Sequence, residues 1–260
     1  PAWPGRDTFE GEIFHASEYR NAEPYRDRDV VVVGSGNTGA EIAVDLVEGG
    51  ARRVRLSIRT PPHVVLREAL GVPTLALGML MRRLSPKVVD PITKFAGRLT
   101  VGDLSRYGLP RPERGLYTRI IEDDAIPLID VGLIDCLKRG DVTVIPAVKS
   151  FDGADVLLEG DERVTTDVVI AATGYERRLD GLVGHLGVLR PDGRPSIRGG
   201  RTHPDAPNLY FTGFTNPISG MFREMNIDAR RIARSVARER AQGTGGRVPL
   251  VQRLRLAVPW

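Results

Sequence analysis

The stretch Asp29-Val30-Val31-Val32-Val33-Gly34-Ser35-Gly36-Asn37-Thr38-Gly39 decides the fold of this chain. Its run of valines is typical of a strand that is buried on both faces of a parallel sheet. The run leads directly into three glycines with the spacing G-x-G-x-x-G. After Gly39, apolar residues recur at helical spacing and Gly49-Gly50 predicts the helix end. Val54–Ile58 then predicts a second strand, which completes a βαβ unit.

The glycine spacing is weak evidence by itself, because the chain contains 29 glycines. Here, however, each glycine has a role in a strand–turn–helix unit. Gly34 permits the sharp turn, Gly36 lets the backbone approach a pyrophosphate, and Gly39 allows the helix to pack on the strand. The phosphates would meet free N–H groups at the positive end of the helix dipole. We predict dinucleotide binding at residues 34 to 39, with an ordinary glycine-rich turn as the alternative.

The end of the second strand distinguishes between the two nicotinamide nucleotides. An NAD-binding unit usually carries an acidic residue there, which accepts hydrogen bonds from the ribose hydroxyls. This chain instead has Ser57-Ile58-Arg59-Thr60. A guanidinium suits the 2′-phosphate of NADP, which a carboxylate would repel. The pattern favours NADPH over NADH, and a solvated strand-end arginine is the alternative.

The rest of the chain continues an α/β pattern. Residues 66–101 are mostly helical in pattern, with interruptions expected at Pro73, Pro86 and Pro91. A short helix is expected within residues 126–139, and a long one begins near Met221 with an apolar face. Further strands are expected at Val142–Ile145, Val156–Leu158, Val168–Ala171 and Leu209–Thr212.

Composition argues against several other classes of protein. The net charge is +4, but acidic residues are interspersed with the arginines and no basic run alternates with aromatics, so nucleic-acid binding is not indicated. The single cysteine, Cys136, cannot form a disulfide framework or a Cys-based metal site within the chain, and we expect it to be a small buried apolar residue. There is no apolar stretch long enough to span a membrane and no signal-peptide pattern, so we expect a cytoplasmic protein.

Further segments resemble the class B flavin-dependent monooxygenases. Phe9-Glu10-Gly11-Glu12-Ile13-Phe14-His15-Ala16-Ser17-Glu18-Tyr19 matches their F-x-G-x-x-x-H-x-x-x-Y fingerprint. Arg59-Thr60-Pro61-Pro62-His63 resembles the strand end of the YUCCA-like branch and its bacterial relatives. Ala171-Ala172-Thr173-Gly174-Tyr175 resembles the linker that returns to the FAD domain, and Leu209-Tyr210-Phe211-Thr212-Gly213-Phe214 resembles the closing strand beside the flavin. Tyr19-Arg20 stands where the Baeyer–Villiger branch has Trp followed by Pro or Asp, which favours the heteroatom-oxidising or YUCCA-like branch.

The resemblance implies a Rossmann-like NADP-binding domain, a parallel sheet with flanking helices, followed by the C-terminal part of the FAD domain of a two-dinucleotide-binding flavoprotein. We expect a linker at residues 1–28, the NADPH-binding domain at 29–167 with a helical insert at 66–101, the return part of the FAD domain at 168–242, and a tail at 243–260. Members of the family carry an earlier glycine motif for FAD. We find no such motif here and expect this chain to lack the N-terminal FAD-binding segment.

The resemblance also implies a reaction. NADPH reduces FAD, and the reduced flavin forms a hydroperoxide with molecular oxygen that transfers one oxygen atom to a small organic molecule. The residues implied in cofactor binding, besides residues 34–39, Arg59 and Thr60, are His15, Thr173, Gly174, Tyr175, Gly213 and Phe214. No catalytic residue and no metal is assigned. The alternatives are an NADP(H)-binding module and an NADPH-dependent flavin reductase without oxygenation, and a homo-oligomer stays open.

Two other oxidoreductase classes do not fit the residues. A short-chain dehydrogenase needs Tyr-x-x-x-Lys, and no tyrosine of this chain has a lysine four places on. A flavin disulfide reductase needs a redox pair of cysteines, and this chain has one cysteine.

Overall fold

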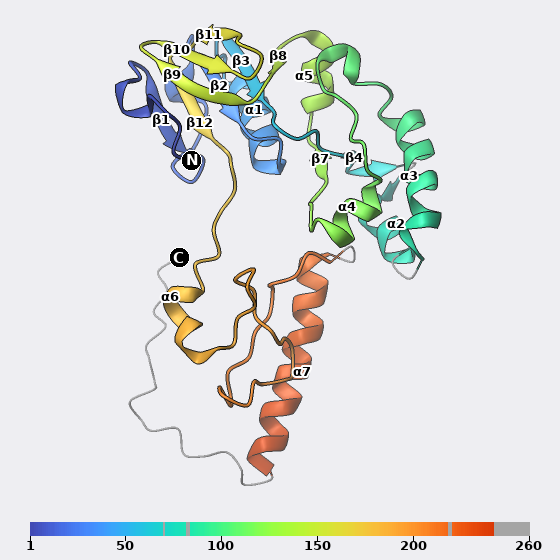
Figure 1. Cartoon of the computed structure of the whole chain (residues 1–260). Coiled ribbons are helices and arrows are strands. Elements are labelled where there is room, and N and C mark those ends of the chain that lie inside the picture. Colours follow the sequence, from blue (N-terminus) through green and yellow to red (C-terminus); the bar gives the residue numbers. More distant parts are fainter. Residues whose placement is uncertain (70, 82–83, 218–219, 242–260) are drawn as a thin grey trace. The chain divides into compact units, whose positions relative to one another are not determined.

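The computed structural model describes residues 1–69, 71–81, 84–217 and 220–241 (Figure 1). The chain divides into two compact units, Pro1–Tyr175 (unit 1) and Glu176–Trp260 (unit 2). Each unit is described by itself.

Unit 1 is built on a five-stranded parallel sheet in the order β1-β12-β2-β3-β8. The strands are β1 (Glu12–His15), β2 (Asp29–Val33), β3 (Arg53–Ser57), β8 (Val142–Ile145) and β12 (Val168–Ala171). The helix α1 (Asn37–Glu48) connects β2 to β3, as the glycine turn predicted. All five residues of β2 are buried, in accordance with a central strand covered on both faces. The predicted α/β class with a Rossmann-like parallel sheet is confirmed.

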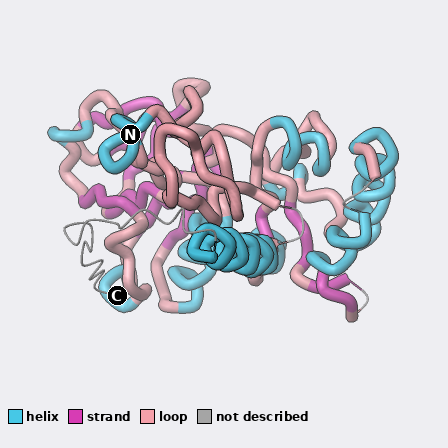
Figure 2. The backbone as a smooth tube through the Cα atoms, turned by 90° about the horizontal axis from the view of Figure 1, so that it is seen from below, coloured by secondary structure: helices cyan, strands magenta, loops and turns pink. Residues whose placement is uncertain are grey.

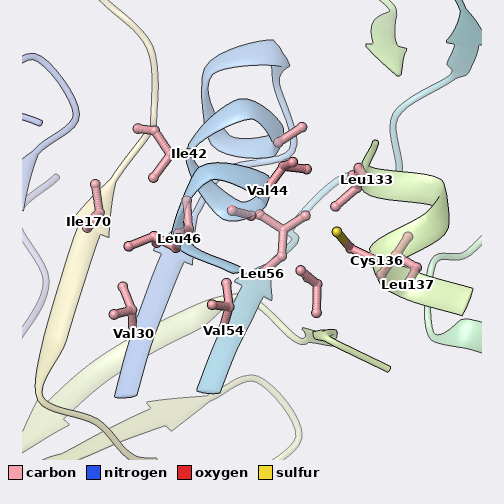
Figure 3. Close-up of a cluster of buried hydrophobic side chains, with 14 of the residues drawn as sticks. Val30, Ile42, Val44, Leu46, Val54, Leu56, Leu133, Cys136, Leu137 and Ile170 are labelled. Carbon is pink, nitrogen blue, oxygen red and sulfur yellow. The ribbon is translucent and has the colours of Figure 1, made fainter. Parts of the chain in front are cut away.

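The valines of β2 belong to two separate hydrophobic clusters, because alternate side chains of a strand point to opposite faces of the sheet. Val30 and Val32 pack with α1 and α5 (Leu133–Arg139) on one face. Figure 3 shows this cluster, in which Cys136 lies among Val44, Leu133 and Leu137. Cys136 is 3% exposed, which confirms that it is a buried apolar residue.

Val31 and Val33 belong to the cluster on the opposite face of the sheet. This face is covered by a three-stranded antiparallel sheet in the order β11-β10-β9. Its strands are β9 (Val148–Asp152), β10 (Asp155–Leu158) and β11 (Arg163–Thr165). Unit 1 therefore has three layers: two helices, the parallel sheet and the antiparallel sheet (Figure 1). The strand expected at Val156–Leu158 is confirmed as part of β10.

The segment between β3 and β8 contains the region expected as a helical insert, residues 66–101, together with short strands and two further helices. Its elements are β4 (Val64–Leu66), β5 (Glu68–Ala69), β6 (Val72–Pro73), α2 (Thr74–Met81), α3 (Pro86–Thr100), α4 (Leu116–Glu122), β7 (Leu128–Asp130) and α5. Short 3-10 helices lie at Arg6–Thr8, Glu23–Tyr25, Ser105–Tyr107 and, in unit 2, Gly184–Leu186. β4 pairs with β7, and β5 with β6.

The expected interruption at Pro91 is wrong, because α3 continues through this residue. Proline removes one backbone hydrogen bond from a helix, but neighbouring residues hold α3 in place here. Val89 is fully buried, and the carboxylate of Asp90 accepts hydrogen bonds from the Tyr117 backbone N–H (2.6 Å) and the Thr118 hydroxyl (2.6 Å). Pro86 is compatible with the helix, since it lies in its first turn.

Residues from two segments that we expected outside the βαβ domain lie in the parallel sheet of unit 1. β1, from the expected linker at 1–28, pairs with β12, and β12 pairs with β2 over the register Val168↔Val30 to Ala171↔Val33. Unit 1 ends after Tyr175, whereas we expected the domain to end at residue 167.

Unit 2 contains α6 (Asp180–Val183), α7 (Met221–Ala241) and mostly loops (Figure 2). The strand expected at Leu209–Thr212 is wrong. A strand needs a neighbour to pair its backbone groups, and the described residues of unit 2 form two isolated bridges and no ladder. The apolar face expected on α7 also differs, because Ala229 and Ala233 are exposed. Gly200 instead lies against Arg231 and Ser235 of this helix.

No helix in the described ranges is long and apolar enough to cross a membrane.

A buried carboxylate fixes the start of β2. Asp29 is 3% exposed and accepts hydrogen bonds from Arg52 Nε (2.6 Å) and from the guanidinium of Arg53. Burial by itself raises the pKa of Asp29, but the hydrogen bonds and charges of the two arginines outweigh burial and hold the pKa below its ordinary value. The backbone N–H of Asp29 donates a hydrogen bond to the Asp167 carboxylate (2.8 Å), and the backbone N–H of Asp167 donates one to the Asp29 oxygen (3.0 Å).

We expect Asp29→Asn to lower the free energy of unfolding of unit 1 at neutral pH by about 1–3 kcal/mol, since hydrogen bonds to charged groups are lost. Because the folded pKa is below the unfolded value of about 3.9, this stability is present above that pH and is lost as the pH falls through the folded pKa. The variant should therefore lose less stability than the wild type between about pH 5 and pH 2. Urea melts across this range measure the effect.

The control is Asp152→Asn, since Asp152 is 70% exposed and 3.6 Å from Arg163. An exposed pair of this kind contributes less than about 1 kcal/mol. Equal acid sensitivity of wild type and Asp29→Asn would contradict the role given to Asp29.

Candidate functional site

Two of the three motif glycines are required by contacts within unit 1. Gly34 has φ +131°, and a Cβ there would lie 2.2 Å from the backbone oxygen of Ala172. A Cβ on Gly39 would lie 2.1 Å from the backbone oxygen of Gly34. These close approaches bring α1 down onto the turn and the turn onto the end of β12. Both glycines are explained without a ligand.

Gly36 differs, because no contact among the described residues requires a glycine there. Its φ of −82° suits any residue, and apart from its chain neighbours no described atom lies within 4 Å of its ideal Cβ position. Gly36 is the N-cap of α1, and within the described part of the chain no side chain caps this helix. The first N–H groups of a helix have no partner inside the helix. The turn thus presents an open space beside free donors at the positive end of a helix dipole.

The side chains of Ser35 and Asn37 hold the turn in place. Ser35 Oγ donates a hydrogen bond to the backbone oxygen of Thr60 (3.0 Å), which ties the turn to the residues after β3. Asn37 Oδ1 accepts a hydrogen bond from the Ile129 N–H (2.7 Å), and Asn37 Nδ2 donates to the Pro127 oxygen (3.3 Å). The Asn37 amide thus makes one donated and one accepted hydrogen bond to the residues around β7, which fix the orientation of its side chain. Thr38 is exposed on the first turn of α1.

A pocket of about 140 Å³ lies beside this turn. Three predicted site residues line it: Ser35, Gly36 and Thr60. The other lining residues are Pro62, His63, Leu116, Arg119, Ala125, Ile126 and Pro127. The pocket thus combines the glycine turn and the residues after β3 with residues of α4 and of the loop that follows it, which are far apart in the sequence.

The pocket contains a cation that the sequence did not point to. Arg119 lies on α4, 18% exposed, and donates a hydrogen bond from its guanidinium to the Pro61 oxygen (2.6 Å). Its distance to the Asp123 carboxylate is 3.9 Å, at the limit of an ion pair. Arg119 is about 60 residues from Arg59 in the sequence and follows no recognisable motif, so only the fold brings it to the turn.

His63 contributes a neutral ring to the same pocket. Burial lowers its pKa, and the nearby charge of Arg119 acts in the same direction, whereas the hydrogen bond to the Arg114 oxygen opposes the shift. His63 Nε2 lies 2.8 Å from that oxygen. Since a carbonyl only accepts, Nε2 carries the proton and Nδ1 has a free lone pair.

Arg59 and Thr60 follow β3 and are both exposed. Within the described ranges no carboxylate pairs with Arg59, so its guanidinium is free to meet an anion. Arg59 does not line the pocket, although Thr60 does.

His15 joins the fingerprint segment to the linker at the end of β12. Its Nδ1 lies 2.9 Å from the Ser17 hydroxyl and accepts a hydrogen bond from the Ser17 N–H (3.1 Å), so its Nε2 carries the proton. Nε2 lies 3.1 Å from the Gly174 oxygen, to which it donates. The rings of His15 and Tyr175 meet edge to face at 5.0 Å. His15, Gly174 and Tyr175 therefore form one cluster, and Thr173 lies between this cluster and the Gly34 turn.

Tyr19, the last residue of the fingerprint, has a structural contact. Its hydroxyl donates a hydrogen bond to Asp45 of α1, and its ring stacks on Tyr25 at 5.7 Å. Burial, followed by the bond to Asp45, raises the pKa of the Tyr19 hydroxyl above its ordinary range. Tyr19 thereby holds the fingerprint segment on the helix that follows the glycine turn.

The last two predicted site residues, Gly213 and Phe214, lie in unit 2. Gly213 has φ +83°, and a Cβ there would lie 3.6 Å from the sulfur of Met225 on α7. Phe214 meets Phe211 edge to face at 6.1 Å. The neighbouring Thr212 hydroxyl is buried and has no hydrogen-bond partner among the described residues. No group of three or more metal-ligating side chains is found in the described ranges.

Sequence comparison identifies relatives of this chain. A family model described as flavin-binding monooxygenase-like matches residues 1–182. A probable indole-3-pyruvate monooxygenase, YUCCA10 of Arabidopsis thaliana, is 35% identical over 218 residues, which are 83% of this chain and 55% of the relative. Indole-3-pyruvate monooxygenase YUCCA8 of Oryza sativa subsp. japonica is 38% identical over 225 residues, 83% of this chain and 52% of the relative. The chain thus spans about half the length of the curated relatives it matches.

Solved structures agree on the fold. A cyclohexanone-bound cyclohexanone monooxygenase superposes with a TM-score of 0.64 at 18% identity, over 94% of this chain and 60% of that protein. A flavin-containing monooxygenase from Stenotrophomonas maltophilia superposes with a TM-score of 0.56 at 17% identity, over 92% of this chain and 58% of that protein. At these identities the similarity shows a shared fold.

Proposed function

Since this chain belongs to the flavin-binding monooxygenase-like family, we propose that it is the NADPH-binding portion of a flavin-dependent monooxygenase that acts on a small organic molecule. The single observation that carries the nucleotide assignment is Gly36. Its missing side chain leaves an open space beside uncapped helix N–H groups, in a position where the protein itself requires no glycine. A pyrophosphate fits such a space, because its oxygens accept hydrogen bonds and carry negative charge.

The residues around the turn would bind the rest of the nucleotide. The backbone of Ser35, Gly36, Asn37 and Thr38 would hold the phosphates, and Arg59 would pair with the 2′-phosphate. Arg119 adds a second positive charge at the pocket wall, and the neutral His63 beside it adds none. When bound, NADPH supplies a hydride. The protein's part is to bind and orient the nucleotide and to exclude water.

The His15 cluster would position the linker. His15 holds the Gly174 carbonyl and packs on Tyr175, which fixes the backbone after β12 next to the glycine turn. We infer that His15 acts as a positioning residue, because both of its ring nitrogens are engaged with the protein.

The residues present fit a flavin less well. Within the described ranges, the turn at Gly34–Gly39 is the one that joins a buried parallel strand to a helix with G-x-G-x-x-G spacing, and it serves one dinucleotide. Gly213, Phe214 and the unpaired hydroxyl of Thr212 would supply part of a flavin site. We therefore assign most of the flavin contacts to the half of the longer relatives that this chain does not span.

The second candidate function is an NADP(H)-binding module or an NADPH-dependent flavin reductase. The same observation favours it, since a single dinucleotide turn in the described part of the chain is what a nucleotide-binding module needs.

Oxygen consumption tests the proposed function. A protein that also carries the part of the relatives that this chain does not span should oxidise NADPH with matching uptake of oxygen and yield an oxygenated small molecule. Reduction of flavin with no transfer of oxygen to any of a panel of small acceptors would instead support the reductase. Binding of NADPH without flavin reduction would support the binding module.

Arg59→Ala should remove the preference for NADPH. We expect this chain to bind NADPH more tightly than NADH by about 10- to 100-fold, which corresponds to the roughly 1.5–3 kcal/mol of a charge-assisted hydrogen-bond pair. The variant should bind both nucleotides equally, at the wild-type affinity for NADH. Isothermal titration with the two nucleotides measures both values.

The matched control is Lys138→Ala, which removes an exposed cation on α5 and should keep the preference. Equal affinity of the unmutated chain for the two nucleotides would refute the assignment of Arg59.

A further inference from the structure

The helix α3 presents an unusual surface on the insert of unit 1. Val88, Ile92, Phe95 and Leu99 are 50% to 72% exposed. They are spaced i, i+4, i+7 and i+11, so they form one continuous stripe along the helix. We call these four residues the apolar stripe. Leu84, which lies two residues before the helix, is also 47% exposed.

A row of cations lies beside the apolar stripe. Lys87, Lys94 and Arg98 are exposed and are spaced i, i+7 and i+11, each one residue before a member of the apolar stripe. We call these three residues the basic row. Within the described ranges, none of the three forms an ion pair.

The opposite side of α3 holds it on unit 1. Val89 is fully buried, and Thr93 and Gly97 are partly buried. Asp90, the one acidic residue of the helix, points to this side, where its carboxylate accepts hydrogen bonds from Tyr117 and Thr118 of α4. The helix is therefore anchored by one side, and the exposed side carries positive charge alone. Figure 1 shows α3 at an outer edge of unit 1.

We propose that the exposed side of α3 docks unit 1 on an anionic membrane surface. A helix that lies in the plane of a bilayer interface has aromatic and aliphatic residues on one side and Lys or Arg beside them. The apolar stripe would enter the boundary between headgroups and acyl chains, while the basic row would pair with lipid phosphates. This binding is at the surface and needs no membrane-spanning helix.

Charge favours a lipid surface over a second copy of the chain. A two-fold contact through the apolar stripe would bring two basic rows to one interface, and α3 has no exposed carboxylate to neutralise them. An anionic bilayer removes this repulsion, because the charge that α3 lacks is supplied by the headgroups. The proposal is independent of the nucleotide site, which lies at α1.

Vesicle flotation tests the proposal. The chain should float with phosphatidylcholine vesicles that contain about 30% phosphatidylglycerol and should bind much less to phosphatidylcholine alone. The triple variant Lys87→Gln, Lys94→Gln, Arg98→Gln should bind the anionic vesicles on the order of 100-fold less tightly, at about fivefold for each cation. The double variant Phe95→Gln, Leu99→Gln should lose at least about tenfold.

Matched variants control for charge and for surface hydrophobicity. Arg6→Gln, Arg26→Gln, Lys138→Gln removes three exposed cations elsewhere on unit 1 and should leave vesicle binding unchanged. Leu182→Gln removes a side chain that is 72% exposed, as Leu99 is, and should also have no effect. Thermal melts and NADPH titration of every variant establish that the fold is retained.

Two kinds of result would overturn the proposal. The first is a vesicle experiment in which the chain does not bind anionic vesicles, or in which the control variants lose as much vesicle binding as the α3 variants. The second is a dimer that forms without lipid in sedimentation analysis and that the double variant Phe95→Gln, Leu99→Gln dissociates. That result would show that the apolar stripe contacts a second copy of the chain.

Discussion

Gly36→Val should weaken NADPH binding by more than about 100-fold while it changes the free energy of unfolding by less than about 1 kcal/mol. The reason is that a Cβ at this position would have no described atom within 4 Å apart from its chain neighbours, and the extended backbone of Gly36 suits a β-branched residue. The side chain would fill the space that we assign to the pyrophosphate. The cost to the fold is limited to a poorer N-cap on α1.

Titration calorimetry and a urea melt on the same preparation measure the two quantities. The control is Gly97→Val on α3, which also has no atom within 4 Å of its ideal Cβ and should leave NADPH binding unchanged. If Gly36→Val binds NADPH as the wild type does, then the turn at Gly34–Gly39 is not the phosphate site and the proposed function loses its main support.

Gly39→Ala, unlike Gly36→Val, should destabilise unit 1 by about 3 kcal/mol or more. Alanine normally stabilises a helix interior relative to glycine by up to about 1 kcal/mol. Here its Cβ would lie 2.1 Å from the Gly34 oxygen, and both are held by backbone, so α1 must move away from the end of β2. For a unit of this size, the loss corresponds to a fall in Tm of roughly 6–12 °C.

The matched control is Gly97→Ala in α3. The ideal Cβ position of Gly97 has no described atom within 4 Å beyond its own helix backbone, so alanine should stabilise unit 1 by up to about 1 kcal/mol. The two alanine variants thus have opposite expected signs for the same chemical change. A Tm of Gly39→Ala at or above that of the wild type would contradict the packing of α1 on the turn. Because the turn shifts with α1, NADPH binding should weaken as well, so it is the loss of stability that separates Gly39→Ala from Gly36→Val.

The contrast shows why one motif contains glycines of two kinds. Gly34 and Gly39 are needed by the fold, because at each position a backbone oxygen lies so close that a Cβ would collide with it. Gly36 is needed only if something else lies beside the turn. The motif in the sequence gives all three glycines equal weight, and the distances around each one separate the structural role from the role in binding.

Several expectations failed where local sequence conflicts with tertiary contacts. Pro91 lies inside α3 because Val89 and Asp90 hold the helix from the protein side. Leu209–Thr212 has strand-forming residues but no strand to pair with among the described residues of unit 2. In both cases local propensity is weaker than the packing and pairing around the segment.

The sequence by itself determined the βαβ unit, because a valine run, a glycine turn and an amphipathic helix are local signals that need no information from distant residues. It also predicted family membership, since the fingerprint and the linker keep their order along the chain. Only the tertiary structure brought Arg119 and His63 to the turn, joined His15 to Gly174, and exposed one side of α3. These features depend on which segments pack together, and residues separated by as many as the 159 positions between His15 and Gly174 carry no periodic signal that would relate them.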